Sequence, residues 1–142
     1  GIATGRAMLA AMILGADGVQ IGSRFAASVE SSSHENFKKL LTQIPEGATQ
    51  VTLKELAPVR LIKNKFYDDL QQAYARCASV DELKQILGRA RAKKGMFEGD
   101  LEEGELEIGQ VSGLIDKIMP VADIIRDITT EFELAKKEAV TL

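Results

Sequence analysis

Two glycine-bearing turns near the start of the chain have the residue types that bind phosphate. The first is Gly1-Ile2-Ala3-Thr4-Gly5, and the second is Gln20-Ile21-Gly22-Ser23. Glycine leaves backbone N–H groups uncovered, and two sets of N–H groups that converge on one point form an anion cradle. The alternative is two ordinary turns that flank a helix. On the motif alone both interpretations stay open, and the cradle would predict a cofactor that carries a phosphate group.

The elements between the two turns favour the cradle. Thr4 can cap an apolar helix at residues 6–14, and Gly15 can end it. Residues 18–22 then alternate small and apolar side chains, which predicts a very short strand. A helix and a strand between two phosphate-binding turns are typical of the seventh and eighth strands of a (β/α)8 barrel.

The chain is too short to form such a barrel alone. A barrel needs roughly 250 residues, and this chain has 142 and opens inside a turn. One short strand also cannot form a sheet. We therefore expect an α/β fold in which residues 1–44 are the C-terminal end of a TIM barrel and residues 45–142 are a mostly helical extension. The N-terminal barrel segment would come from a separate chain or a cleaved portion.

Most of the extension has helical patterning. Ser32 with Glu35 and Ser79 with Glu82 both match the capping box, so we expect one helix to run to about residue 44 and another to about residue 94. The intervening pattern predicts a helix at residues 66–77 and a short strand or extended loop at residues 50–53. We expect the acidic residues 96–109 to form a loop or lid. A short helix is expected at residues 112–118 and a long helix from residue 120 onward.

Composition excludes several classes of protein. The formal net charge is −3, with 18 basic and 21 acidic residues, so no basic nucleic-acid surface or polybasic membrane anchor is expected. No apolar run approaches the roughly 20 residues of a membrane span. The single cysteine rules out an internal disulfide, and we expect a reducing, cytoplasmic location.

Single reactive residues offer little chemistry of their own. His34 stands alone in a polar run, and we expect it to lie at the surface or to cap a helix. Cys77 falls on a helical stripe and is expected in the core. Arg24 is either a surface charge or a member of a buried ion pair. The acidic run lacks the spacing of a calcium loop, so we predict a solvated loop and no metal site.

Basic residues gather near the end of the predicted helix at residues 80–94. Their position fits the negative end of the helix dipole, and contact with an acidic carrier protein is the less favoured alternative. The apolar stripe of the last helix fits core packing or a homodimer interface. These basic residues are Arg89, Arg91, Lys93 and Lys94.

The paired turns resemble the C-terminal part of the nitronate monooxygenase family, formerly called 2-nitropropane dioxygenases. This family includes the FMN-dependent enoyl-acyl-carrier-protein reductases. The resemblance covers nearly the whole chain and is most specific at Gly1–Gly5 and Gly15–Phe25. Further downstream, Glu30-Ser31 with His34, Val59–Asn64 and Gly99–Leu114 look more like the reductase branch.

The resemblance implies a barrel that binds FMN without a covalent bond. It places the FMN phosphate on backbone groups of two turns, with an added hydrogen bond from the Ser23 hydroxyl. It also implies that the catalytic histidine lies upstream of this segment, so the catalytic residues are unknown and His34 is given no such role. The implied phosphate ligands are Gly1, Gln20, Ile21, Gly22 and Ser23.

The resemblance and the helical patterning give three competing hypotheses for the function of the protein. The leading hypothesis is an enoyl-acyl-carrier-protein reductase of fatty acid synthesis, which uses NADH or NADPH to reduce trans-2-enoyl thioesters. Its partner would be an acyl-carrier-protein-linked or small-molecule substrate. The first alternative is a nitronate monooxygenase that oxidises alkyl nitronates with FMN and O₂. The second is a non-catalytic helical interaction module. The segment alone is expected to be inactive.

Overall fold

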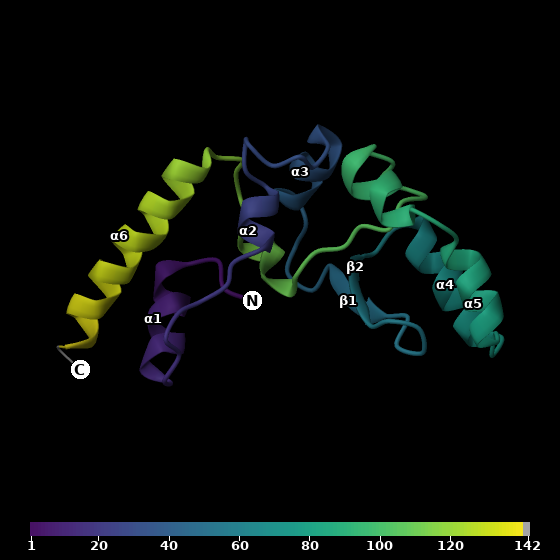
Figure 1. Cartoon of the computed structure of the whole chain (residues 1–142), viewed down its shortest axis with the longest axis horizontal. Coiled ribbons are helices and arrows are strands. Elements are labelled where there is room, and N and C mark those ends of the chain that lie inside the picture. The colour runs from purple at the N-terminus through teal and green to yellow at the C-terminus, as the bar shows by residue number, and fades with distance from the viewer. Residues whose placement is uncertain (141–142) are drawn as a thin grey trace.

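The computed structural model describes residues 1–140 and has the form of an arch (Figure 1). α1 and α6 lie at one end of the arch, α4 and α5 at the other, and α2 and α3 between them. The fold is mainly helical with one small sheet. In chain order the elements are α1 (Gly5–Ile13), α2 (Ser23–Ala26), α3 (Glu35–Leu41), β1 (Thr49–Thr52), β2 (Val59–Ile62), α4 (Lys65–Ala75), α5 (Val80–Leu87), the π-helical turn η1 (Lys93–Phe97), the 3-10 helix η2 (Gln110–Leu114) and α6 (Val121–Ala139).

The last helix returns to the first. The Thr4 hydroxyl caps α1 as expected, accepting from the Ala7 N–H at 3.2 Å. Gly5 then lets the α6 backbone approach so closely that a Cβ atom at Gly5 would lie 2.1 Å from the Ile128 carbonyl oxygen. The Gly5 N–H donates to Glu131 Oε2 at 2.7 Å. The start of α1, next to the first predicted turn, is thereby fixed by α6.

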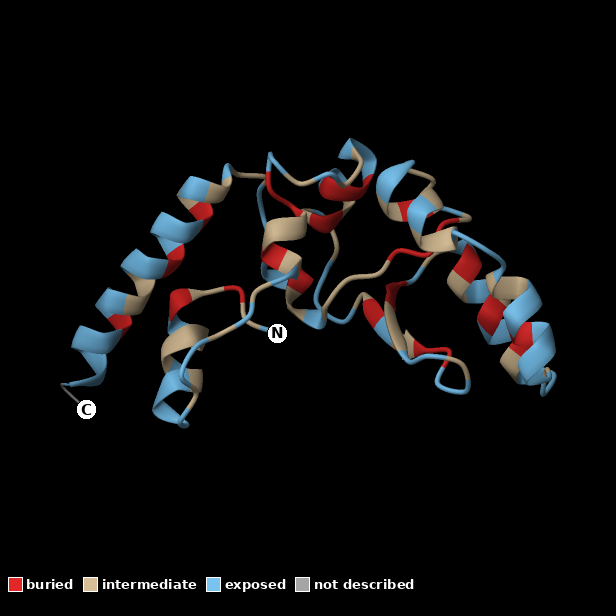
Figure 2. Cartoon of the chain, in the orientation of Figure 1, coloured by how far each residue is buried: buried red, intermediate tan, exposed pale blue. Residues whose placement is uncertain are grey.

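Buried apolar residues include two clusters along the arch rather than one central core, and further buried residues lie where α1 meets α6 (Figure 2). One cluster surrounds α3 and includes Phe37, Leu41 and Ile62. The other lies under α4 and α5 and includes Leu61 and Phe66. β2 joins the two clusters, because its alternate residues face opposite sides of the sheet.

The sheet pairs β1 with β2 in antiparallel register, with Thr49 opposite Ile62 and Val51 opposite Arg60. A third extended segment continues it, since the Ile62 N–H donates to the Leu106 carbonyl at 3.0 Å and the Ile108 N–H donates to the Arg60 carbonyl at 3.2 Å. Residues 106–108 therefore lie beside β2, and the chain that follows them reaches α2.

The strand expected at residues 18–22 is not formed. These residues run without regular secondary structure between α1 and α2, and within residues 1–140 no other strand pairs with them. A strand is defined by its hydrogen-bonded neighbour. The alternation of small and apolar residues was therefore not enough to form one in this chain.

Only one of the two capping boxes forms. Ser79 and Glu82 bond each other's backbone N–H as predicted, at 3.3 and 2.8 Å. The capping box predicted at Ser32 and Glu35 is wrong. His34 caps α3 instead, through its Nδ1, which accepts from the Asn36 N–H at 3.1 Å. The capping role expected of His34 is thus confirmed.

Three further expectations are corrected. α5 ends at Leu87, because Gly88, its C-cap, has a φ of 65° that breaks the helix well before residue 94. Cys77 is exposed at φ 56°, beyond the end of α4, rather than in the core. The helix expected at residues 112–118 is the 3-10 helix η2. In the part of the chain that the structure describes, no helix has the length and hydropathy needed to cross a membrane.

Candidate functional site

An open hollow of about 660 Å³ separates the start of α2 from the small sheet. One side is formed by the turn that leads into α2, and the other by β2 and the segment that follows residue 106. Gly1 lies at its edge. The residues that border it are Gly1, Gly22, Ser23, Ala26, Pro58, Val59, Arg60, Glu107, Ile108, Gly109 and Gln110.

The start of α2 has unpaired backbone donors, and Ser23 among them borders this hollow. Gly22 is the N-cap, and its carbonyl accepts from the Phe25 and Ala26 N–H groups, both at 3.0 Å. The N–H groups of Ser23 and Arg24 precede the first bonded turn, and neither donates to another group within residues 1–140. Unpaired N–H groups at a helix start attract anions.

Neither the packing nor the backbone conformation of this chain requires a glycine at position 22. Its φ of −109° and ψ of −63° are open to other residues. A Cβ atom at Gly22 would meet no protein atom within 4 Å. The absent side chain therefore leaves room in the hollow, as a ligand that approaches the backbone closely would require.

Ser23 adds a hydroxyl group at the same place. Its Oγ accepts a hydrogen bond from the Gly109 N–H at 3.0 Å. A hydroxyl group has one hydrogen to donate and two lone pairs, so the bond to Gly109 leaves the Ser23 hydrogen available for a ligand. Gly109 packs tightly here, because a Cβ atom on it would lie 2.6 Å from Ser23 Oγ.

The structure brings part of the predicted phosphate site together. Gly1, Gly22 and Ser23 all border the hollow, although 20 residues separate the two turns. Gln20 is exposed and Ile21 is half-buried, and neither borders the hollow. These two residues lie in the segment that leads into the Gly22 turn.

Sequence reasoning missed Arg60 and Gly109 as members of the site. Arg60 belongs to a segment noted for its family resemblance, and Gly109 ends the acidic segment predicted as a loop or lid. They reach the hollow because residues 106–108 pair with β2, and a pairing across more than 40 residues leaves no local signal in the sequence. Arg60 Nη1 donates to the carbonyl and hydroxyl oxygens of Thr49, at 3.2 and 3.1 Å.

Arg24 is buried beside the site and points away from its donors. Its guanidinium donates to the Lys117 carbonyl at 3.1 Å and to Met119 Sδ at 3.0 Å. Arg24 is therefore not a surface charge, and within the described residues it is not a member of a buried ion pair either. Its role is to tie α2 to the segment before α6.

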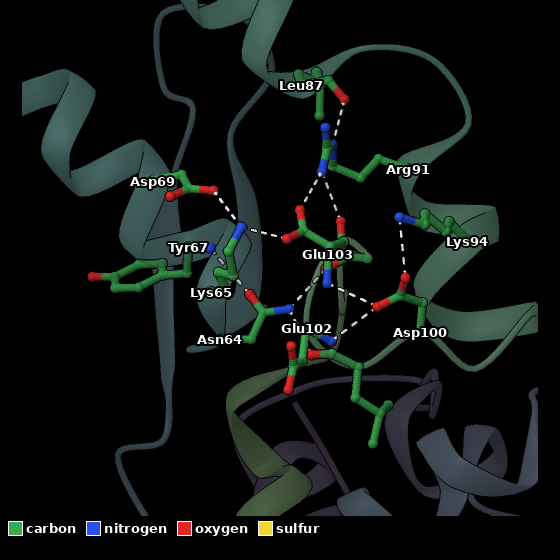
Figure 3. Close-up of polar contacts among 12 residues, drawn as sticks. Asn64, Lys65, Tyr67, Asp69, Leu87, Arg91, Lys94, Asp100, Glu102 and Glu103 are labelled. Atoms are coloured by element: carbon green, nitrogen blue, oxygen red, sulfur yellow. Dashed lines mark hydrogen bonds and ion pairs between the residues drawn. The ribbon is translucent and has the colours of Figure 1, made fainter.

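The acidic segment 96–109 is packed rather than solvated, which corrects its prediction as a solvated loop (Figure 3). Asn64 holds it by donating to the Leu101 and Gly104 carbonyls, both at 2.9 Å. Arg91 donates to the Glu103 carbonyl at 2.7 Å and lies over the Phe66 ring. Among the described residues, no group of three or more His, Cys, Asp or Glu side chains could hold a metal ion.

The basic residues near η1 are largely matched by this acidic segment. Lys93 pairs with Glu98 at 3.2 Å, and Lys94 with Asp100 at 3.0 Å. Their charges are thus compensated within the chain, which weakens the case for an acidic partner at this surface. Burial raises the pKa of Glu105 in the same segment to about 7, and the nearby Glu107 carboxylate adds to the shift.

Residues 1–131 match the family model described as nitronate monooxygenase. The chain belongs to the nitronate monooxygenase family. Members of this family are FMN-dependent oxidoreductases. The Neurospora crassa nitronate monooxygenase is 29% identical to this family member over 136 residues, which cover 92% of this chain and 36% of the relative. A probable nitronate monooxygenase from Staphylococcus saprophyticus is 36% identical over 102 residues, or 67% of this chain and 28% of the relative.

Solved structures agree with this assignment. FabK from Thermotoga maritima superposes with a TM-score of 0.90 and 37% identity, over 99% of this chain and 44% of FabK. Nitroalkane oxidase from Streptomyces ansochromogenes gives a TM-score of 0.72 and 26% identity, over 97% of this chain and 39% of that protein. This nitronate monooxygenase family member thus corresponds to part of a TIM-barrel structure and spans less than half the length of these relatives.

Proposed function

We propose that the start of α2 holds the phosphate group of FMN in a flavin oxidoreductase. One observation carries the proposal: the unpaired N–H groups of Ser23 and Arg24 begin a helix beside a hollow where Gly22 lacks a side chain. An FMN phosphate is a dianion with several acceptor oxygens, so it complements these donors. The Ser23 hydroxyl hydrogen adds one more donor.

In this proposal the chain binds and orients the cofactor. Backbone N–H groups and the Ser23 hydroxyl fix the phosphate, and the bond from Gly109 fixes the Ser23 side chain in turn. Gly1, which also borders the hollow, would add a backbone contact from the first turn, and Gln20 and Ile21 would contribute only through their backbone next to Gly22. When bound, FMN supplies hydride-transfer chemistry that protein side chains lack.

We infer that the complete protein is an enoyl-acyl-carrier-protein reductase that uses NADH or NADPH. We assign FabK to the reductase branch of the family. The 37% identity to FabK, against 26% to nitroalkane oxidase over a similar share of the chain, supports the same branch for this protein. Its substrate would be a trans-2-enoyl thioester, either linked to acyl carrier protein or small.

Oxidation of alkyl nitronates is the second candidate, favoured by the family model and by the Neurospora crassa relative. The test is to purify the complete protein and measure its visible spectrum and two activities. We expect a flavin spectrum and NADH- or NADPH-dependent reduction of crotonyl thioesters. Rapid oxidation of nitronates with no thioester reduction would overturn the reductase proposal. A colourless protein that takes up no FMN would instead support a non-catalytic helical module.

We further propose that the groups that react with substrate lie outside this chain. The chain spans 44% of FabK, and residues 18–22 have no strand beside them within residues 1–140. In the complete protein, parallel strands of the remaining barrel would pair with this segment. Residues 1–44 would then complete the barrel, and an intact mass of the purified protein would report the additional segment.

A further inference from the structure

We propose that Arg60 binds the same phosphate group from the opposite side of the hollow and thereby selects a phosphorylated flavin. This inference rests on the proposed FMN site. The hollow has two sides, and the first, at the start of α2, offers neutral N–H and O–H donors. Arg60 lies on the second side, where β2 borders the hollow.

The strand register directs the Arg60 side chain toward α2. Residues two apart in a strand share a face, so Arg60 projects on the same side of the sheet as Ile62. Ile62 packs in one cluster with Ala27, the C-cap of α2, and with Ala26. Arg60 therefore lies on the α2 side of the sheet.

The guanidinium of Arg60 is held but not neutralised. Nη1 is fixed by the two oxygen atoms of Thr49, which is itself buried. No carboxylate within residues 1–140 forms an ion pair with Arg60. A planar guanidinium has five N–H donors, so donors remain for the paired oxygen atoms of a phosphate.

The acidic residue that borders the same hollow faces away from Arg60. Glu107 pairs directly across from Leu61, and directly paired residues share a face of the sheet. Leu61 belongs to the cluster under α4 and α5, on the side opposite Arg60. The Glu107 carboxylate also acts on the pKa of Glu105, two residues away on that same side. The α2 side thus keeps a positive charge.

The test compares FMN with riboflavin, which differs from FMN only by lacking the phosphate group. The complete protein is freed of flavin, and the two dissociation constants are measured by quenching of flavin fluorescence. The variants are Arg60→Met and Arg60→Lys, with Lys63→Met as the matched control. Lys63 is exposed just beyond β2 and forms no ion pair within the described residues.

We expect Arg60→Met to weaken FMN binding by about 10- to 100-fold, as for the loss of a charged hydrogen bond, and to leave riboflavin binding unchanged. Arg60→Lys should weaken FMN less, and Lys63→Met should match the wild type. If Arg60→Met keeps the wild-type ratio of the two constants, or weakens both flavins equally, the Arg60 proposal is wrong and the FMN site stands. If the wild-type protein binds neither flavin, the FMN site fails and the Arg60 proposal fails with it.

Discussion

Replacing Gly5 with alanine drives a methyl group into the backbone of α6. The added Cβ would lie 2.1 Å from the Ile128 carbonyl oxygen and 2.3 Å from the Phe132 nitrogen, whereas ordinary contacts begin at 3.4 Å. These neighbours are backbone atoms of α6, so they cannot move aside by changing a side-chain rotamer. Either α1 and α6 separate by about 1 Å, or the start of α1 unwinds, and close-packed interiors resist both.

The cost of Gly5→Ala has two parts. Overpacking of a close contact typically destabilises a protein by about 1–3 kcal/mol. Separation of the helices also breaks the 2.7 Å hydrogen bond from the Gly5 N–H to the Glu131 carboxylate, and hydrogen bonds to charged groups contribute about 1.5–3 kcal/mol. We therefore expect a loss on the order of 3 kcal/mol in the free energy of unfolding.

Urea denaturation of the complete protein measures this loss. The matched control is Ser32→Ala, because Ser32 is exposed and its side chain caps no helix. We expect the control to unfold at the wild-type urea concentration and Gly5→Ala to unfold well below it. A Gly5→Ala variant within about 0.5 kcal/mol of the wild type, the usual effect of a surface change, would refute the close contact of α1 with α6.

Three further predictions follow from the structure. Gly22→Ala should leave the unfolding midpoint unchanged but weaken FMN binding at least about tenfold, since its methyl group would stand in the hollow. Ser32→Ala is the control for both measurements. Ser79→Ala should cost about 1 kcal/mol of stability by removing a helix cap, whereas Ser32→Ala, which alters no cap, should cost nothing measurable by the same urea titration. Because the pKa of Glu105 is raised from 4.5 to about 7, the native state keeps a proton that the unfolded state has released. Its contribution to stability is full below about pH 4.5 and is lost as the pH rises through 7, and Glu105→Gln should remove this part of the pH dependence.

The sequence predicted the local features of the site better than its assembly. The Thr4 cap and the capping box at Ser79 depend on neighbouring residues, so their pattern is visible in a short window. Arg60 reaches the hollow through strand pairing between distant segments. Nothing near Arg60 in the sequence indicates that pairing.

The errors have a common physical cause. Residues 18–22 have the pattern of a strand but no neighbour in the chain with which to form one. Ser32 has the spacing of a cap, but His34 stands directly before α3 and supplies a nitrogen acceptor in its place. The acidic segment looks like a solvated loop by composition, although Asn64 and the lysines of η1 hold it against the fold. In each case the local pattern alone was not sufficient, because a partner was missing or another contact replaced the expected one.

The central claim is that this chain holds the phosphate group of FMN at the start of α2. A crystal structure of the complete protein with FMN tests it directly. We expect phosphate oxygen atoms at about 2.7–3.2 Å from the Ser23 nitrogen, with Ser23 Oγ donating to one of them and Gly22 against the phosphate. A phosphate bound elsewhere, with the Ser23 and Arg24 N–H groups covered by another part of the protein, would contradict the claim.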